Sequence, residues 1–260
     1  MTGTGAPALL FDRRAWRLHR ERAVRRGAVR FLHDEIAARL GERLDLVRGD
    51  FAEALALGLP APALPVSRTV AADPAAALRP SVVADPELLP FRAASFDLAV
   101  SNLVLHWNAD LPGALAQLRR VLRPDGLLLA ALFGGQTLVE LRTALLEAEL
   151  AEEGGASPRV SPTVELGDAA ALLQRAGFAM PVADTETVTV TYADLFALMR
   201  DLRGMGETNA LASRRRTATR RATLARAAAL YAERFAGADG RIPATFEILF
   251  LTGRAPPGPG

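Results

Sequence analysis

The chain has 260 residues, half of them hydrophobic, and its 31 basic and 29 acidic residues give a formal net charge of +2. It contains no cysteine and no lysine. Their absence excludes disulfides, cysteine-based metal centres, Schiff-base lysines and the lysine of a nucleotide-binding P-loop. No apolar run approaches the roughly 18 residues that would span a bilayer, so we expect a globular protein.

The N-terminal part, residues 1–45, is predicted to form two helices that pack on the core. Apolar residues recur at helical spacing from Arg13 to Arg43, with an interruption at Gly27. Acidic Asp12 and Glu21 argue against a transit peptide, and we therefore expect a cytoplasmic location.

The arginine-dense stretches, residues 13–30 and 214–226, are interpreted as solvated helix faces. No aromatic interleaving or known nucleic-acid motif accompanies them, so we expect no nucleic-acid partner. The abundance of Ala, Arg, Gly and Pro is typical of a bacterial genome with a high GC content.

Beyond Asp50, short apolar runs alternate with helical segments, which is the pattern of a parallel sheet covered on both faces. Strands are predicted at 52–57, 66–72, 81–84, 96–101, 126–133, 182–192 and 245–254. Further helices are predicted at 111–122, 136–151, 167–176, 193–203 and 217–235. A helix stop and turn is expected at 123–126. The core domain would span 46–254 with a helical insertion at about 193–236, and 255–260 would be a disordered tail.

Two stretches carry a resemblance to a known family. Residues 91–102 (FRAASFDLAVSN) resemble the fourth-strand motif of class I S-adenosylmethionine (SAM) methyltransferases, and 122–126 (LRPDG) resemble the entry to their fifth strand. The resemblance implies an α/β fold with a Rossmann-like, mostly parallel sheet, an antiparallel last strand and helices on both faces.

Later blocks are similar to one branch of that family, the assembly factors of respiratory complex I. These blocks are 133–142 (FGGQTLVELR), 153–162 (EGGASPRVSP), 201–209 (DLRGMGETN) and 242–248 (IPATFEI). The branch implies action on a protein, an NADH dehydrogenase subunit, and a mitochondrial relative is described as an arginine hydroxylase. The malonyl-carrier-protein methyltransferase of biotin synthesis is a more distant likeness.

The resemblance implies a cofactor site for SAM at the carboxyl ends of the strands. Asp73 would accept hydrogen bonds from the ribose, Asp85 would meet the adenine, and Gly58 would lie beside the methionine end. Each aspartate has an alternative interpretation as a helix-cap or turn residue.

The loop after the first strand departs from the family pattern. Ala56 stands where an acidic residue belongs, and Pro60 and Pro62 replace glycines. Proline removes a donor and fixes φ, so this loop would weaken or abolish SAM binding.

Substrate-side candidates follow the fourth strand: Asn102, which would also contact the cofactor, His106, Trp107 and Asn108. His106 and Asn102 are the candidate catalytic residues, with His106 as a general base. Packing beneath the cofactor is the alternative for His106 and Trp107.

Three further candidates on the substrate side, Thr137, Glu140 and Arg142, would be either helix caps or part of the wall of the active site. Residues 204–209 would be a mobile lid or an interhelical turn. His19 and His33 are interpreted as helix-surface residues, and no metal site is expected.

The function predicted from these observations is a SAM-dependent methyltransferase-like protein of complex I assembly, acting by methyl transfer or arginine hydroxylation. Two alternatives stay open. One is a non-catalytic assembly factor that has lost its cofactor loop. The other, weaker alternative is a nucleic-acid-binding module that uses the arginine stretches.

Overall fold

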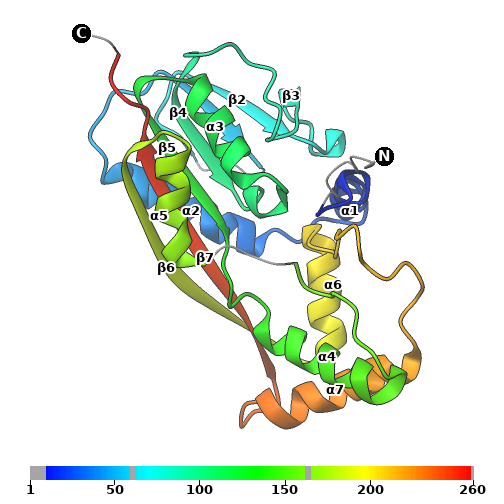
Figure 1. The fold of residues 1–260 in the computed structure, drawn as a ribbon. Helices are drawn as coiled ribbons and strands as arrows, with labels where there is room; N and C mark the ends of the chain where they lie inside the picture. The colour runs from blue at the N-terminus through cyan, green and yellow to red at the C-terminus, as the bar shows by residue number, and fades with distance from the viewer. Residues whose placement is uncertain (1–9, 59–62, 162–164, 259–260) are drawn as a thin grey trace, which may run out of the picture.

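The computed structural model describes residues 10–58, 63–161 and 165–258. Within these ranges, seven strands form one sheet with the order β3-β2-β1-β4-β5-β7-β6 (Figure 1). The strands are β1 (Glu53–Leu57), β2 (Arg68–Asp73), β3 (Val82–Val83), β4 (Phe96–Asn102), β5 (Leu122–Phe133), β6 (Ala179–Tyr192) and β7 (Ile242–Arg254). β7 runs antiparallel to β5 and β6, and the other pairs are parallel. The predicted sheet with its antiparallel last strand is confirmed.

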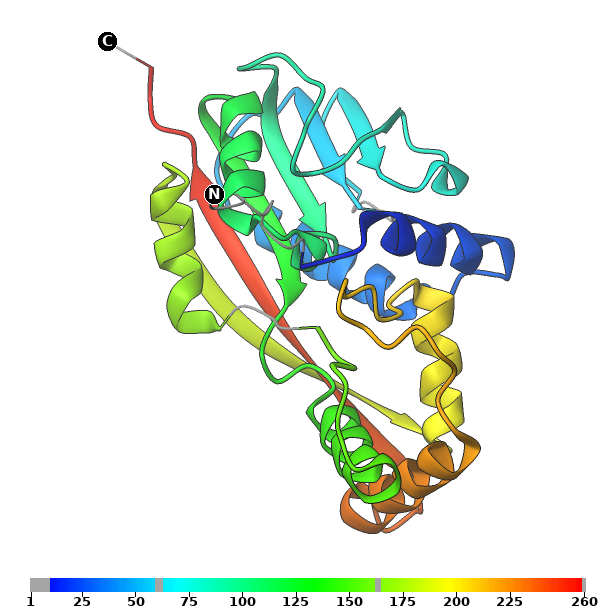
Figure 2. The ribbon, with the colours of Figure 1, turned by 45° about the vertical axis from the view of Figure 1, so that its right-hand side comes forward.

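Helices cover both faces of the sheet. α3 (Leu111–Val121) and α5 (Leu166–Arg175) share one hydrophobic cluster with β4 and β5, whereas α2 (Phe31–Asp45) packs on the opposite face. The long strands β6 and β7 extend past the other strands, and α4 (Val139–Glu153), α6 (Leu195–Met205) and α7 (Arg221–Phe235) gather there (Figure 1). α1 (Arg13–Arg25) lies beside the end of β2 and the top of α6 (Figure 2).

Side-chain caps fix where several helices begin. Asp12 accepts a hydrogen bond from the Ala15 amide at the start of α1, and Asp110 accepts one from Gly113 at the start of α3. These caps satisfy amide groups that have no partner inside the helix. The start of α1 is therefore defined by the residue that precedes its first turn.

The predicted helix stop is confirmed, because α3 ends at Val121, but the turn predicted at 123–126 is wrong, because β5 already begins at Leu122. The pairing with β4 passes from Phe96–Leu122 to Leu98–Leu127, so extra residues bulge out of β5. Asp125 adopts a left-handed φ of 61°. A Cβ on Gly126 would lie 2.8 Å from the Arg123 carbonyl oxygen. Turn-forming residues therefore serve here to bend a strand.

The first residue after β7 is attached to this bulge. The Ala255 amide donates to the Gly126 carbonyl at 2.8 Å, and Ala255 is buried. No helix in the described ranges has both the length and the apolar character needed to cross a membrane.

Candidate functional site

Parallel pairing aligns the carboxyl ends of the first four strands at one edge of the sheet. Gly58 directly follows β1, while Asp73 and Asn102 are the last residues of β2 and β4. Gly58 has φ +75°, and a Cβ there would lie 2.4 Å from the Asn102 carbonyl oxygen. Only glycine fits this junction without strain. Pro60 and Pro62 lie outside the described residues, and Ala56 is buried within β1.

Asp73 is completely buried at this edge and pairs with an arginine of α1. Arg20 donates to its carboxylate through Nη2 at 2.6 Å and Nε at 3.3 Å, and the Ala75 amide donates at 2.8 Å. Burial disfavours the charged form of Arg20, but the attraction of Asp73 outweighs it and raises the pKa of the guanidinium. The interpretation of residues 13–30 as solvated is therefore wrong for Arg20, which is only 4% exposed.

Asp85 holds a second arginine of α1. Arg13 Nε donates to Asp85 Oδ2 at 2.9 Å, and the amide of Glu87 donates to Asp85 Oδ1 at 3.0 Å. The same guanidinium donates to the Trp107 carbonyl and to Asn108 Oδ1. Asp85 therefore has the backbone contact of a turn residue together with an ion pair across to α1.

His33, interpreted from the sequence as a helix-surface residue, is buried instead. Its carbonyl accepts a hydrogen bond from Asn102 Nδ2 at 3.0 Å, which ties α2 to the end of β4. Burial lowers the pKa of the His33 imidazole to about 4. The surface interpretation is also wrong for His19, which is half-buried and contacts the Thr208 carbonyl through Nδ1 at 3.1 Å.

His106 and Trp107 meet at one buried carboxylate, that of Glu207. His106 Nε2 lies 3.1 Å from Glu207 Oε2, and Trp107 Nε1 donates to the same oxygen at 3.0 Å. An ionised carboxylate only accepts hydrogen bonds. In a neutral His106, Nε2 must therefore carry the proton, which leaves Nδ1 as the basic nitrogen. Nδ1 has no hydrogen-bond partner among the described residues.

The charge of Glu207 is maintained by its neighbours. Burial favours the protonated acid, but the hydrogen bond from His106 and the positive charge of Arg20 outweigh it and lower the pKa of the carboxyl. Glu207 Oε1, like His106 Nδ1, is buried without a partner in the described structure. When His106 is neutral, the pair therefore presents two unsatisfied acceptor atoms within one cluster.

A cavity of about 370 Å³ adjoins this cluster, and His106, Trp107 and Glu207 lie on its wall. Most of the wall is apolar, with Phe133, Leu138, Leu141, Leu145, Met199, Leu202, Leu224 and Phe246. Such a cavity, largely apolar with a few converging polar atoms, has the character of a small-molecule or side-chain binding site.

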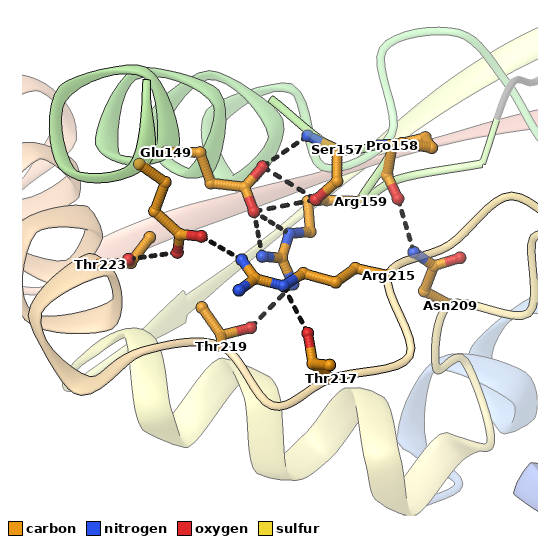
Figure 3. Close-up of polar contacts among 10 residues, drawn as sticks. Glu149, Ser157, Pro158, Arg159, Asn209, Arg215, Thr217, Thr219 and Thr223 are labelled. Atoms are coloured by element: carbon orange, nitrogen blue, oxygen red, sulfur yellow. Dashed lines mark hydrogen bonds and ion pairs between the residues drawn. The ribbon is translucent and has the colours of Figure 1, made fainter. Parts of the chain in front are cut away.

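One side of the cavity is built by an ion-pair network that joins carboxylates of α4 to the loop after α4 and the loop after α6 (Figure 3). Buried Glu149 accepts from the Ser157 amide at 2.8 Å and from Arg159 Nε at 2.8 Å. Burial opposes its ionisation, but Arg159 and Ser157 lower the pKa of Glu149. Asn209 Nδ2 donates to the Pro158 carbonyl at 2.8 Å, which links the two loops.

Three arginines on the cavity wall are neutralised by carboxylates. Arg159 pairs with Glu149, Arg215 with Glu153, and Arg214 with Asp12. Arg203 also lines the cavity and has no ion pair within the described ranges. The described residues contain no group of three or more His, Asp or Glu side chains arranged to hold a metal ion.

The remaining substrate-side candidates differ in their positions. Thr137 lines the cavity, and its hydroxyl donates to the Glu247 carbonyl at 3.0 Å. Glu140 accepts from the Thr245 amide at 3.2 Å, and Arg142 donates to the Gly135 carbonyl at 2.7 Å. Neither Glu140 nor Arg142 is among the residues on the cavity wall.

Sequence reasoning missed Glu207 and Arg20 as individual residues. Glu207 lies in the 204–209 segment, which attracted attention for its two glycines, and Gly206 does adopt a left-handed φ of 83° as the cap of α6. Arg20 stands among similar arginines, and only its seven-residue spacing from Arg13 hints at a shared face.

The chain is similar to one family model and to several curated proteins. Residues 36–130 match the family model described as a methyltransferase domain. The chain is 48% identical over 173 residues to human arginine-hydroxylase NDUFAF5, mitochondrial, with coverage of 66% of this chain and 50% of that protein. The Danio rerio protein of the same name is 47% identical over 175 residues, with coverage of 67% and 54%.

A second group of relatives carries a different name. The malonyl-acyl-carrier-protein O-methyltransferase of Xylella fastidiosa (strain M23) is 43% identical over 175 residues, with coverage of 67% of this chain and 57% of the relative. The chain thus spans about half the length of the curated relatives it matches.

Solved structures share the fold at low sequence identity. YcgJ from Bacillus subtilis aligns with a TM-score of 0.53 at 14% identity, covering 84% of this chain and 98% of that one. A candidate methyltransferase from Bacillus halodurans C-125 aligns with a TM-score of 0.52 at 17% identity, covering 85% and 98%.

Proposed function

Because the chain has the class I methyltransferase fold and carries a methyltransferase domain over residues 36–130, we propose that it is a SAM-binding enzyme that modifies a protein during complex I assembly. The observation that carries the proposal is the buried His106–Glu207 pair beside the cavity of about 370 Å³. Identity of 47–48% to proteins named arginine-hydroxylase NDUFAF5 supports a role in complex I assembly.

The residues at the edge of the sheet are of the types that bind a nucleoside cofactor. Asp73 and Asp85 are carboxylates at strand ends, where such groups accept hydrogen bonds from ribose and base. Gly58 gives the close backbone approach beside Asn102. In the conformation described, however, Arg20 already occupies the Asp73 carboxylate. SAM, when bound, supplies an electrophilic methyl group.

The buried acceptor atoms beside the cavity suit a substrate that carries hydrogen-bond donors. Glu207 Oε1 and His106 Nδ1 are buried acceptors without partners in the described ranges, and a guanidinium or amide brings N–H groups to them. His106 Nδ1 would take a proton from the substrate as a general base. The apolar residues on the wall lower the local polarity, which strengthens both interactions.

The test is a reaction with isolated NADH dehydrogenase subunits, purified chain and SAM, followed by mass spectrometry of the products. A methyl group on one side chain, lost in the His106→Gln variant, is expected. Glu233→Gln, an exposed change on α7, is the matched control and should retain activity. Equal product from wild type and His106→Gln would contradict the role of His106.

A second candidate function is supported by the Arg20–Asp73 pair, which closes the carboxylate proposed for the ribose. A non-catalytic assembly factor would keep this site closed and would bind no cofactor. In that case, calorimetry would detect no SAM binding, while co-purification with NADH dehydrogenase subunits would persist in an Asp85→Ala variant.

A further inference from the structure

Helix α1 reaches both of the carboxylates proposed to bind the nucleoside. Arg13 and Arg20 are seven residues apart, or about two helical turns, so they lie on the same face of α1. Arg20 donates to Asp73 at the end of β2, and Arg13 donates to Asp85 after β3. One face of one helix thus supplies hydrogen-bond donors at both positions.

The contact between Asp73 and Arg20 is closed to solvent. The Asp73 side chain is 0% exposed and that of Arg20 is 4% exposed. Both carboxylate oxygens already accept hydrogen bonds, from Arg20 and from the Ala75 amide. A ribose hydroxyl can reach this carboxylate only after the guanidinium has moved away.

The aliphatic stem of Arg20 is held against α6, although a cavity of about 320 Å³ adjoins the side chain. A Cβ built on Gly206 would lie 3.2 Å from both Cα and Cγ of Arg20, so the cap of α6 packs directly against it. Because the stem is held, we expect the guanidinium to leave Asp73 together with the helix.

Backbone hydrogen bonds connect α1 to the loop that carries Glu207. The Asp12 amide donates to the Ala210 carbonyl at 2.7 Å, and the Val29 amide donates to the Gly204 carbonyl at 3.0 Å. Phe11 and Leu211 form an antiparallel bridge. We define α1 together with residues 204–212 as the closing unit, because these bonds couple the two segments.

We propose that α1 closes the SAM site of the ligand-free protein, because Arg20 and Arg13 donate to the carboxylates that would accept hydrogen bonds from SAM. SAM binding displaces Arg20 from Asp73 and shifts the closing unit. The inference rests on the proposed SAM site and adds its regulation. Since the closing unit carries Glu207, opening also changes the surroundings of His106. Cofactor entry and the substrate cavity are coupled through this one movement.

The first experiment measures binding of S-adenosylhomocysteine by calorimetry to wild type, Arg20→Met and Arg17→Met. Arg17 is an exposed residue of the same helix and provides the control. Because closure reduces the fraction of binding-competent molecules, Arg20→Met should bind at least about tenfold more tightly than wild type. Arg17→Met should equal wild type.

The outcomes separate the two proposals. Equal affinity of wild type and folded Arg20→Met overturns closure by α1 and leaves the proposed SAM site standing. Absence of binding by all three folded proteins overturns the SAM site and, with it, the closure of that site by α1.

The second experiment needs no change at Arg20 and covers the case in which Arg20→Met does not fold. The chain has no cysteine, so an Arg17→Cys and Arg92→Cys protein takes two spin labels at exposed positions on α1 and on the loop before β4. Saturating S-adenosylhomocysteine should shift the distance distribution between the labels. An unchanged distribution in the ligand-bound protein overturns the proposal.

Discussion

The Glu207 carboxylate lies 3.1 Å from Nε2 of His106, although 101 positions separate the two residues in the sequence. Nothing in either local sequence indicates this pairing, which exists only because the loop after α6 folds back onto the end of β4. The pairing defines which nitrogen of the imidazole is basic, so it sets the chemistry available at the cavity.

Glu207→Gln should change the tautomer of His106. A neutral amide is a weaker acceptor than a carboxylate, and its NH₂ group can donate to Nε2, so the preference for a proton on Nε2 is weakened. Nitrogen-15 NMR of histidine-labelled protein measures this directly, and the chain has only three histidines to assign. The substitution should also lower the free energy of unfolding by about 1–3 kcal/mol, because hydrogen bonds to a charged group are lost. An unchanged His106 spectrum would contradict the assignment, and Glu233→Gln is the exposed control.

Removal of Asp73 should cost much more stability than removal of Asp85. Asp73→Ala leaves the buried Arg20 charge without a partner, which typically costs about 3–5 kcal/mol. The Asp85 side chain is 39% exposed, so Asp85→Ala should cost about 1 kcal/mol or less. Urea denaturation of the two variants measures the difference. Similar losses would show that the Arg20–Asp73 pair is not sealed in solution.

Stability should fall on acidification between pH 6.5 and 4 because of His33. The pKa of this imidazole is lowered to about 4 in the folded protein from an ordinary 6.5. The unfolded chain therefore binds the extra proton in this window, and the free energy of unfolding decreases as pH decreases. The full effect is about 3 kcal/mol.

Denaturation of wild type and His33→Leu at several pH values would measure this dependence. Replacement of His33 should flatten most of the slope between pH 6.5 and 4. The half-buried His19, whose pKa burial also lowers, should account for part of what remains, and near pH 4 the carboxyls of Glu149 and Glu207, whose pKa values are lowered, should account for the rest. An equally steep slope in His33→Leu would place the proton uptake elsewhere.

Gly58→Ala should be more destabilising than Gly154→Ala. Both glycines have a left-handed φ, which costs an alanine about 1–2 kcal/mol. At Gly58 the new Cβ would also meet the Asn102 carbonyl oxygen at 2.4 Å, whereas nothing lies within 4 Å at Gly154. Thermal unfolding of both variants should therefore show the larger loss for Gly58→Ala, and equal losses would contradict the close approach.

Hydrophobic periodicity predicts most of the fold, because regular elements depend on local patterns. The predicted strand 96–101 and helix 111–122 differ from β4 and α3 by one residue at one end. The bulge in β5 was missed because Asp125 and Gly126 are also typical of turns, and only the pairing with β4 distinguishes the two.

The candidate site is less predictable from the sequence. Asp73, Asp85 and His106 follow strand ends, where topology alone places them at one edge of the sheet. The partners of these residues come from α1 and from the loop after α6. Arg20 resembles the exposed Arg17 in the sequence, and it differs only in facing a carboxylate 53 positions away.

The bridge between Phe11 and Leu211 has an evolutionary consequence. Asp12 pairs with Arg214, a residue 202 positions away, at the same junction. Substitutions at one side of this junction therefore alter the constraint on the other. Across homologous chains, residues 10–12 and 210–214 should vary in a correlated way, as though they formed one continuous stretch of sequence.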